Sequence, residues 1–155
     1  MKSLKLFIGS GFGSGLIPFA PGTWGSILAL LPIYFLITAG NIFLLITFTV
    51  LCSLLTYWVT PACEEAWGED PGKLVMDEWA GLSLTFLGFS LVGDLKIDAI
   101  LIISGFLLFR FFDILKPLGI NKLQKYDGGT GILLDDLLAG FYALICLKTL
   151  IFFWL

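Results

Sequence analysis

Residues 132–155 read ILLDDLLAGFYALICLKTLIFFWL, an apolar stretch that carries an acidic pair near its start and one lysine towards its end. A helix of this length reaches across a bilayer, because a membrane span needs roughly 20 residues. Four more apolar stretches precede it, at residues 26–39, 42–59, 79–92 and 97–115. The first and third are too short for a full span. They cross the membrane only if helix continues into flanking residues, and otherwise they dip partway into it.

Composition supports a membrane protein. The 155 residues are 58% hydrophobic and 14% charged, with a mean hydropathy of +0.98, whereas soluble domains carry about 25% charged residues. Backbone groups at membrane depth need internal hydrogen bonds, so the expected local structure is helix. We predict one all-α membrane-embedded domain over residues 1–155, a polytopic bundle of about four or five membrane helices, some short or re-entrant. The net charge of −3 argues against a nucleic-acid partner.

The connections between the apolar stretches predict the topology. Residues 40–41 and 93–96 are expected to form tight turns, and residues 60–78 and 116–131 longer, charged loops. If the helices alternate, the tight turns lie on one side of the membrane and the N-terminus and both loops on the other. Seven of the 9 basic residues then fall on the loop side, which the positive-inside rule makes cytoplasmic. The loop side has Lys2, Lys5, Lys73, Arg110, Lys116, Lys122 and Lys125, and the other side has Lys96 and Lys148.

Two acidic pairs stand at helix starts on this cytoplasmic face. Asp77-Glu78 opens the third stretch as DEWAG, and Asp135-Asp136 opens the fifth as DDLLAG. One interpretation is structural, since acids in a first turn favour the positive end of the helix dipole. The other is a cation site, because like charges in a low dielectric repel unless they are protonated or bridged by a cation. Clustered carboxylate oxygens suit Mg²⁺.

A second charged group lies late in the fourth stretch, in FRFFDILKP. Arg110 and Asp113 share one helical face through their i, i+3 spacing. They could form an intramembrane ion pair that only stabilises the bundle. Alternatively, the planar fork of Arg110 binds phosphate oxygens, Asp113 binds metal or orients Arg110, and Lys116 adds a point charge.

Glycine-rich segments precede the first stretch. The runs are GSGFGSG at residues 9–15 and PGTWGS at residues 21–26. Glycines allow backbone N–H groups to approach an anion, and a hydroxyl at a helix start adds a donor. The candidate phosphate-binding residues are Gly11, Gly13, Thr23 and Ser26. No G-K-[ST] follows, so this is not a Walker loop, and a flexible re-entrant turn explains the run about as well.

Several phosphatase mechanisms are excluded by missing residues. The chain has no histidine, its cysteines lack the arginine spacing of a Cys-phosphatase loop, and it has no D-x-D motif. What remains is direct attack by a metal-activated water, with carboxylates holding the metal and arginine steadying the phosphoryl group.

Four blocks together resemble the phosphatidylglycerophosphatase A family. They are GFGSGLIPFAPGTWGS at residues 11–26, LVMDEWAG at 74–81, FRFFDILKPLGI at 109–120 and GGTGILLDDLLAG at 128–140. The resemblance implies a Mg²⁺-dependent enzyme of the bacterial inner membrane that hydrolyses phosphatidylglycerophosphate to phosphatidylglycerol, with a phospholipid in the bilayer as its partner. Gly119 and Met76 depart from the family pattern, but neither removes a charged group.

The resemblance and the residues lead to one hypothesis for the site. The expected catalytic residues are Asp77, Asp113 and Asp136, and one or two Mg²⁺ ions are expected among Asp77, Glu78, Asp135 and Asp136. Phosphate is expected to contact Arg110 and Lys116, with Thr23, Ser26, Gly11 and Gly13.

Two rival functions use similar residues. CDP-alcohol phosphotransferases also have aspartate clusters in membrane helices, but their D-G-x-x-A-R signature is not met after Asp127-Gly128. A small ion or proton transporter could use intramembrane charges as a relay, yet here the charges gather at one face. An assay of phosphate release from lipid would distinguish all three.

Overall fold

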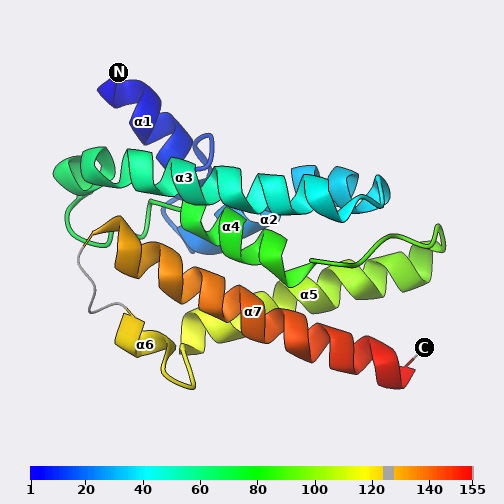
Figure 1. Ribbon diagram of the computed structural model, residues 1–155. Coiled ribbons are helices and arrows are strands. Elements are labelled where there is room, and N and C mark those ends of the chain that lie inside the picture. Colours follow the sequence, from blue (N-terminus) through cyan, green and yellow to red (C-terminus); the bar gives the residue numbers. More distant parts are fainter. Residues whose placement is uncertain (124–127, 155) are drawn as a thin grey trace.

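A computed structural model describes residues 1–123 and 128–154, and these parts of the chain are helical without any strand (Figure 1). The elements are α1 (Lys2–Gly9), the 3-10 turn η1 (Ser14–Leu16), α2 (Pro21–Thr38), α3 (Ile42–Trp67), α4 (Met76–Thr85), α5 (Leu95–Leu115), α6 (Ile120–Leu123) and α7 (Gly129–Trp154). Lys125, which the topology argument used, and Asp127, which was compared with the phosphotransferase signature, lie outside the described residues.

Among the described helices, three are long and apolar enough to cross a bilayer, which supports the predicted membrane bundle. They are Pro21–Thr38, Ile42–Trp67 and Gly129–Phe153. The first reaches this length because helix begins at Pro21, where the missing N–H of proline leaves no donor unsatisfied. α5 has 21 residues and runs between the same two ends of the bundle, but it carries charged residues near both of its ends.

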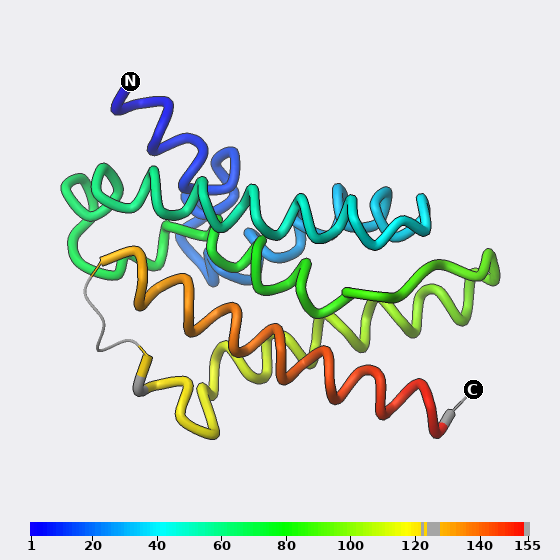
Figure 2. Tube along the Cα trace, in the orientation of Figure 1, coloured from blue at the N-terminus to red at the C-terminus, as the bar shows by residue number. Residues whose placement is uncertain are grey.

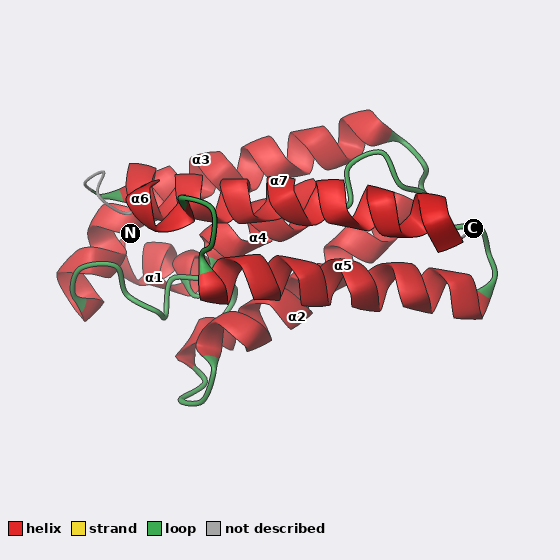
Figure 3. Cartoon of the chain, turned by 90° about the horizontal axis from the view of Figure 1, so that it is seen from below, coloured by secondary structure: helices red, strands yellow, loops and turns green. Residues whose placement is uncertain are grey.

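The helix ends are arranged as the alternating topology predicts. The α2–α3 and α4–α5 connections lie at one end of the bundle with the C-terminus (Figures 1 and 3). The starts of α2, α4 and α7 and the end of α5 lie at the other, as does the N-terminus (Figure 1). Asn41 caps α3 by accepting the N–H of Phe43 at 2.9 Å, which makes residues 40–41 the tight turn that was expected.

Several sequence-based boundaries were wrong. Asp135-Asp136 were predicted to open a helix, but α7 begins at Gly129, so the pair lies more than one turn into the helix. Residues 60–67 were predicted to belong to a loop, but α3 continues through Pro61 to Trp67. This extension is packed, because a Cβ added to Gly9 of α1 would lie 2.5 Å from the sulfur of Cys63. Contact with α1 therefore favours helix where proline and glutamates indicated a loop.

The third apolar stretch is helical only as far as Thr85, so helix was wrongly predicted for the rest of residues 79–92. Several backbone N–H groups after Thr85 find hydrogen-bond acceptors outside a regular helix. Successive turns form around Phe86, and the carboxylate of Asp98 accepts the N–H groups of Val92 and Gly93 at 2.9 and 3.0 Å. Phe86 is fully buried, and a Cβ added to Gly105 would lie 2.4 Å from its ring. By contrast, Gly88, Ser90, Val92 and Gly93 are exposed, so the non-helical backbone lies at the edge of the bundle with several of its N–H groups hydrogen-bonded.

α4 lies at the centre of the bundle and crosses α7 with backbone in direct contact (Figure 2). A Cβ added to Gly140 would lie 2.1 Å from the carbonyl oxygen of Gly81, and one added to Gly81 would lie 2.4 Å from that of Asp136. Both helices start at the same end. Asp77 precedes Gly81 by four residues, as Asp136 precedes Gly140, so one helical turn separates each acid from the crossing. The similarity of DEWAG and DDLLAG thus reflects two helices that pack through their glycines and bring two aspartates together.

Candidate metal and phosphate site

A cavity of about 200 Å³ lies among the starts of α4 and α7 and the end of α5. Its charged lining residues are Asp70, Asp77, Glu78, Asp113, Lys116, Asp135 and Asp136. The four aspartates on the helices are buried, with exposures between 2% and 9%. Two cations pair with the buried carboxylates: Arg110 with Glu78 and Asp113, and Lys116 with Asp135. Because buried like charges repel, this excess of acid favours a bound cation or protonation.

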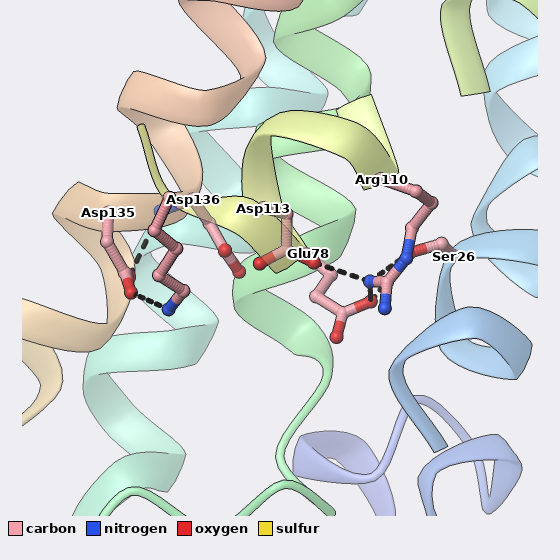
Figure 4. Close-up of polar contacts among 7 residues, drawn as sticks. Ser26, Glu78, Arg110, Asp113, Asp135 and Asp136 are labelled. Carbon is pink, nitrogen blue, oxygen red and sulfur yellow. Dashed lines mark hydrogen bonds and ion pairs between the residues drawn. The ribbon is translucent and has the colours of Figure 1, made fainter. Parts of the chain in front are cut away.

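Arg110 occupies one end of the row of carboxylates (Figure 4). Its Nη1 donates to Glu78 Oε2 at 2.8 Å, to Asp113 Oδ2 at 2.6 Å and to Ser26 Oγ at 3.4 Å. Ser26 Oγ in turn donates to Glu78 Oε2 at 2.6 Å. The Nε of Arg110 is buried and has no hydrogen-bond partner. Ser26, which was predicted to bind phosphate, therefore contacts Glu78 and Arg110.

Lys116 occupies the other end, where its Nζ forms an ion pair with Asp135. Burial lowers the pKa of Lys116. The hydrogen bond and charge of Asp135, with the charges of Asp136 and Asp113, outweigh burial and raise that pKa above its ordinary value. A raised lysine pKa stabilises the fold at neutral pH, and this stabilisation is lost only as the pH rises through the raised value. Lys116 also ends α5 in the left-handed region, at φ 44°.

We expect the Lys116→Gln variant to lower the free energy of unfolding by about 3 kcal/mol in metal-free buffer, because Asp135 would remain buried without its cation. Thermal unfolding in detergent measures this. Lys2→Gln is the matched control, since the ion pair of Lys2 with Glu65 is exposed on both sides and should contribute less than about 1 kcal/mol. Equal effects of the two substitutions would contradict the prediction.

Glu78, Asp113 and Asp135 form ion pairs with Arg110 or Lys116, whereas Asp77 and Asp136 form none with a described cation. The Oδ1 of Asp77 is buried without a hydrogen-bond partner. A buried carboxylate oxygen without a hydrogen-bond partner suits a hard cation such as Mg²⁺, which prefers oxygen ligands. Within the described residues, no three acidic side chains are already arranged as a ligand shell, so binding an ion would require side-chain rotation.

The structure does not bring Gly11, Gly13 or Thr23 into this cavity. A Cβ added to Gly11 would lie 2.7 Å from Val75, and the N–H of Gly13 is taken by the hydroxyl of Ser10 at 3.2 Å. The glycine-rich run thus packs closely against the segment that leads into α4. Gly129, at the start of α7, packs against α3, because a Cβ added to it would lie 3.1 Å from the hydroxyl oxygen of Thr60.

Two residues of the site were missed by sequence reasoning. Asp70 lines the cavity from the α3–α4 loop, and an acid beside Pro71-Gly72 just ahead of DEWAG was the signal for it. Gly22 lies against the Arg110 cluster, since an added Cβ would be 2.1 Å from Glu78 Oε1 and 3.2 Å from Arg110 Nη1. In the sequence, Gly22 could not be told apart from the other glycines near it.

The fold and the site define a helical membrane protein with a buried acidic cavity at one end of its bundle. A family profile described as Phosphatidylglycerophosphatase A matches residues 7–151. The chain belongs to the phosphatidylglycerophosphatase A family. No solved structure matches it.

Three bacterial relatives align over most of their length and of this chain. A Bacteroides thetaiotaomicron protein provisionally named phosphatidylinositol-3-phosphatase is 43% identical over 148 residues, 92% of this chain and 90% of its own. The Haemophilus influenzae phosphatidylglycerophosphatase A is 40% identical over 137 residues, covering 87% and 81%. The Escherichia coli phosphatidylglycerophosphatase A is 34% identical over 133 residues, covering 84% and 73%. The chain is thus similar to bacterial proteins, and three of its described helices are long and apolar enough to cross a membrane.

Proposed function

We propose that this protein is a Mg²⁺-dependent lipid phosphatase that hydrolyses phosphatidylglycerophosphate to phosphatidylglycerol and phosphate. Family membership supports the substrate. The observation that carries the chemistry is the cavity itself, where buried carboxylates outnumber the cations paired with them at the end of an apolar bundle. A divalent cation would offset this excess of negative charge and would in turn attract the anionic phosphate ester.

The two cations bracket the carboxylates and are the groups that would bind the substrate phosphate. Arg110 lies at one end and Asp135 at the other (Figure 4), and Lys116 pairs with Asp135. A phosphate between the two cations would gain charge-assisted hydrogen bonds. Asp113 lines the cavity and holds Arg110 at 2.6 Å, which makes it both an orienting group and a candidate to accept a proton from water.

Asp77, Asp135 and Asp136 are the residues that would hold Mg²⁺ in this scheme. Asp77 and Asp136 would be its principal ligands, because neither forms an ion pair with a described cation. When bound, Mg²⁺ would offset the charge of the phosphate oxygens and make a water molecule more acidic. Asp135 would first have to weaken its pairing with Lys116.

The position of the cavity fits a substrate that remains in the bilayer. The diacylglycerol tails would stay among the apolar helices while the phosphate reaches the helix ends. The positive-inside distribution supports a cytoplasmic active site in the bacterial inner membrane.

The name of the Bacteroides relative makes phosphatidylinositol-3-phosphate a second candidate substrate. Both lipids present a phosphate monoester on a polar headgroup. We expect purified protein in liposomes to release phosphate from phosphatidylglycerophosphate in Mg²⁺ and not in EDTA. We also expect it to prefer that lipid over phosphatidic acid by at least about tenfold, since headgroup hydroxyls add specific contacts.

The same assay separates the alternatives. Turnover of phosphatidylinositol-3-phosphate alone would replace the substrate and keep the enzyme class. No phosphate release from any of the three lipids would contradict the phosphatase proposal and reopen phosphotransfer or transport. Release that persists undiminished in EDTA would contradict the role of Mg²⁺.

A further inference from the structure

We propose that Glu78 and Ser26 are positioning residues that hold Arg110 for the substrate phosphate, and that Glu78 is not a metal ligand. This inference rests on the proposed function and divides the site into two parts. One part, Ser26, Glu78 and Arg110, would bind phosphate. The other, centred on Asp77 and Asp136, would bind the metal.

Both oxygens of Glu78 lie in positively polarised surroundings. Oε2 accepts one hydrogen bond from Ser26 at 2.6 Å and another from Arg110 at 2.8 Å. Oε1 faces Gly22 in the first turn of α2, an 18-residue helix whose N-terminal end carries partial positive charge. A cation approaching Glu78 would be repelled by the adjacent guanidinium, so this carboxylate is a poor metal ligand although it borders the cavity.

Asp77, the preceding residue, has the opposite environment. Its Oδ1 is buried without a partner, and Asp77 lies one helical turn before Gly81, where α4 contacts α7. Adjacent residues on a helix point in directions about 100° apart, so one acidic pair serves two different neighbours. The sequence pair Asp77-Glu78 therefore divides between the two parts of the site.

Arg110 is fixed by three acceptors from three helices. Ser26 of α2, Glu78 of α4 and Asp113 of α5 all contact Nη1. Such contacts hold the guanidinium plane in one orientation before substrate arrives, which lowers the cost of ordering it on binding. The buried Nε still lacks an acceptor, and a phosphate oxygen is the kind of partner that would satisfy it.

The test uses binding measurements, so it does not depend on turnover. Thermal unfolding of the detergent-solubilised protein is followed during titration with Mg²⁺, and then with inorganic phosphate at saturating Mg²⁺. The Glu78→Gln variant should leave the half-maximal Mg²⁺ concentration within about twofold and raise that for phosphate by at least about tenfold, because a charge-assisted hydrogen bond is lost. Ser26→Ala should give the same pattern with a smaller change.

Gly22→Ala perturbs the same contact without changing any charge. Its Cβ would lie 2.1 Å from Glu78 Oε1, the far end of a flexible side chain that can move aside. The fold should persist while the affinity for phosphate falls as in Glu78→Gln. Ile27→Ala is the matched control, because this neighbour of Ser26 is exposed on the outside of the bundle and should change neither titration.

Turnover adds a second readout and an internal check. Glu78→Gln should raise KM more than it lowers kcat, and in an Arg110→Ala background it should add less than about a twofold further loss of phosphate affinity, since both substitutions act through one group. Loss of the Mg²⁺ response in Glu78→Gln, or a full additional effect in the Arg110→Ala background, would overturn the inference. Wild-type protein that binds Mg²⁺ and phosphate but hydrolyses no lipid would refute only the proposed function. Wild-type protein that responds to neither ligand would refute both.

Discussion

Replacing Gly140 with alanine should separate α4 from α7 and disable the protein. The added Cβ would lie 2.1 Å from the carbonyl oxygen of Gly81 and 3.1 Å from its Cα. Both contacts are backbone, so no side chain can rotate away. Overpacking of this kind typically costs about 1–3 kcal/mol, and a forced backbone contact at the crossing belongs at the upper end. Because the crossing also holds Asp77 near Asp136, the affinity for Mg²⁺ should fall together with thermal stability.

The control is Gly72→Ala, judged on stability alone, because nothing lies within 4 Å of a Cβ at that position. Its midpoint of thermal unfolding in detergent should match that of the wild type. Gly81→Ala should behave as Gly140→Ala does, since the two glycines form one contact. A Gly140→Ala protein with normal stability and an unchanged Mg²⁺ titration would show that the helices do not meet there.

Replacing Asp136 with asparagine should reduce turnover to background in reconstituted protein, a loss of at least about a thousandfold if the metal site is catalytic. The fold should survive, because the amide has nearly the shape of the carboxylate. In EDTA the variant should unfold at a higher temperature than the wild type, since one of several buried like charges is gone. Its stabilisation by Mg²⁺ should shrink.

Glu65→Gln provides the comparison for charge removal, because Glu65 is exposed and pairs only with Lys2 among the contacts described. It should change neither turnover nor the response to Mg²⁺. Retained turnover in Asp136→Asn would remove Asp136 from the catalytic group. Retained Mg²⁺ stabilisation with lost turnover would assign it to proton transfer instead.

The sequence was informative about features that depend on local composition. Apolar length and the distribution of charges along the chain were enough to predict an all-α membrane bundle with its acidic residues at one end. The sequence could not predict where α3 and the third stretch end. The extension of α3 past Pro61 depends on contact with Gly9, and the end of α4 at Thr85 depends on the burial of Phe86. Both contacts join residues far apart in the chain.

For the site, as for the fold, the sequence predicted individual residues but not the contacts between residues far apart in the chain. The acidic pairs, Arg110 and Lys116 stood out because ionised groups in apolar stretches are rare. The hydrogen-bond partners of these groups could not be predicted, because adjacent acids differ in them: Glu78 contacts Ser26 and Arg110, and the Oδ1 of Asp77 has no partner. Glycine was the most ambiguous residue, since it permits close approach to an anion and to another helix alike. In this protein, Gly11, Gly81 and Gly140 are each in close contact with protein.

The burial of α4 has a consequence for how the protein tolerates substitution. Eight of its ten residues are buried, whereas α2, α3 and α7 present many apolar side chains outward. An outward-facing leucine can be exchanged for isoleucine or phenylalanine at little cost, because fluid acyl chains adapt to either shape. A residue of α4 has protein on every side and no such freedom. Random substitutions should therefore accumulate on the surrounding helices and be rare on the short inner helix α4, most of which is shielded from lipid.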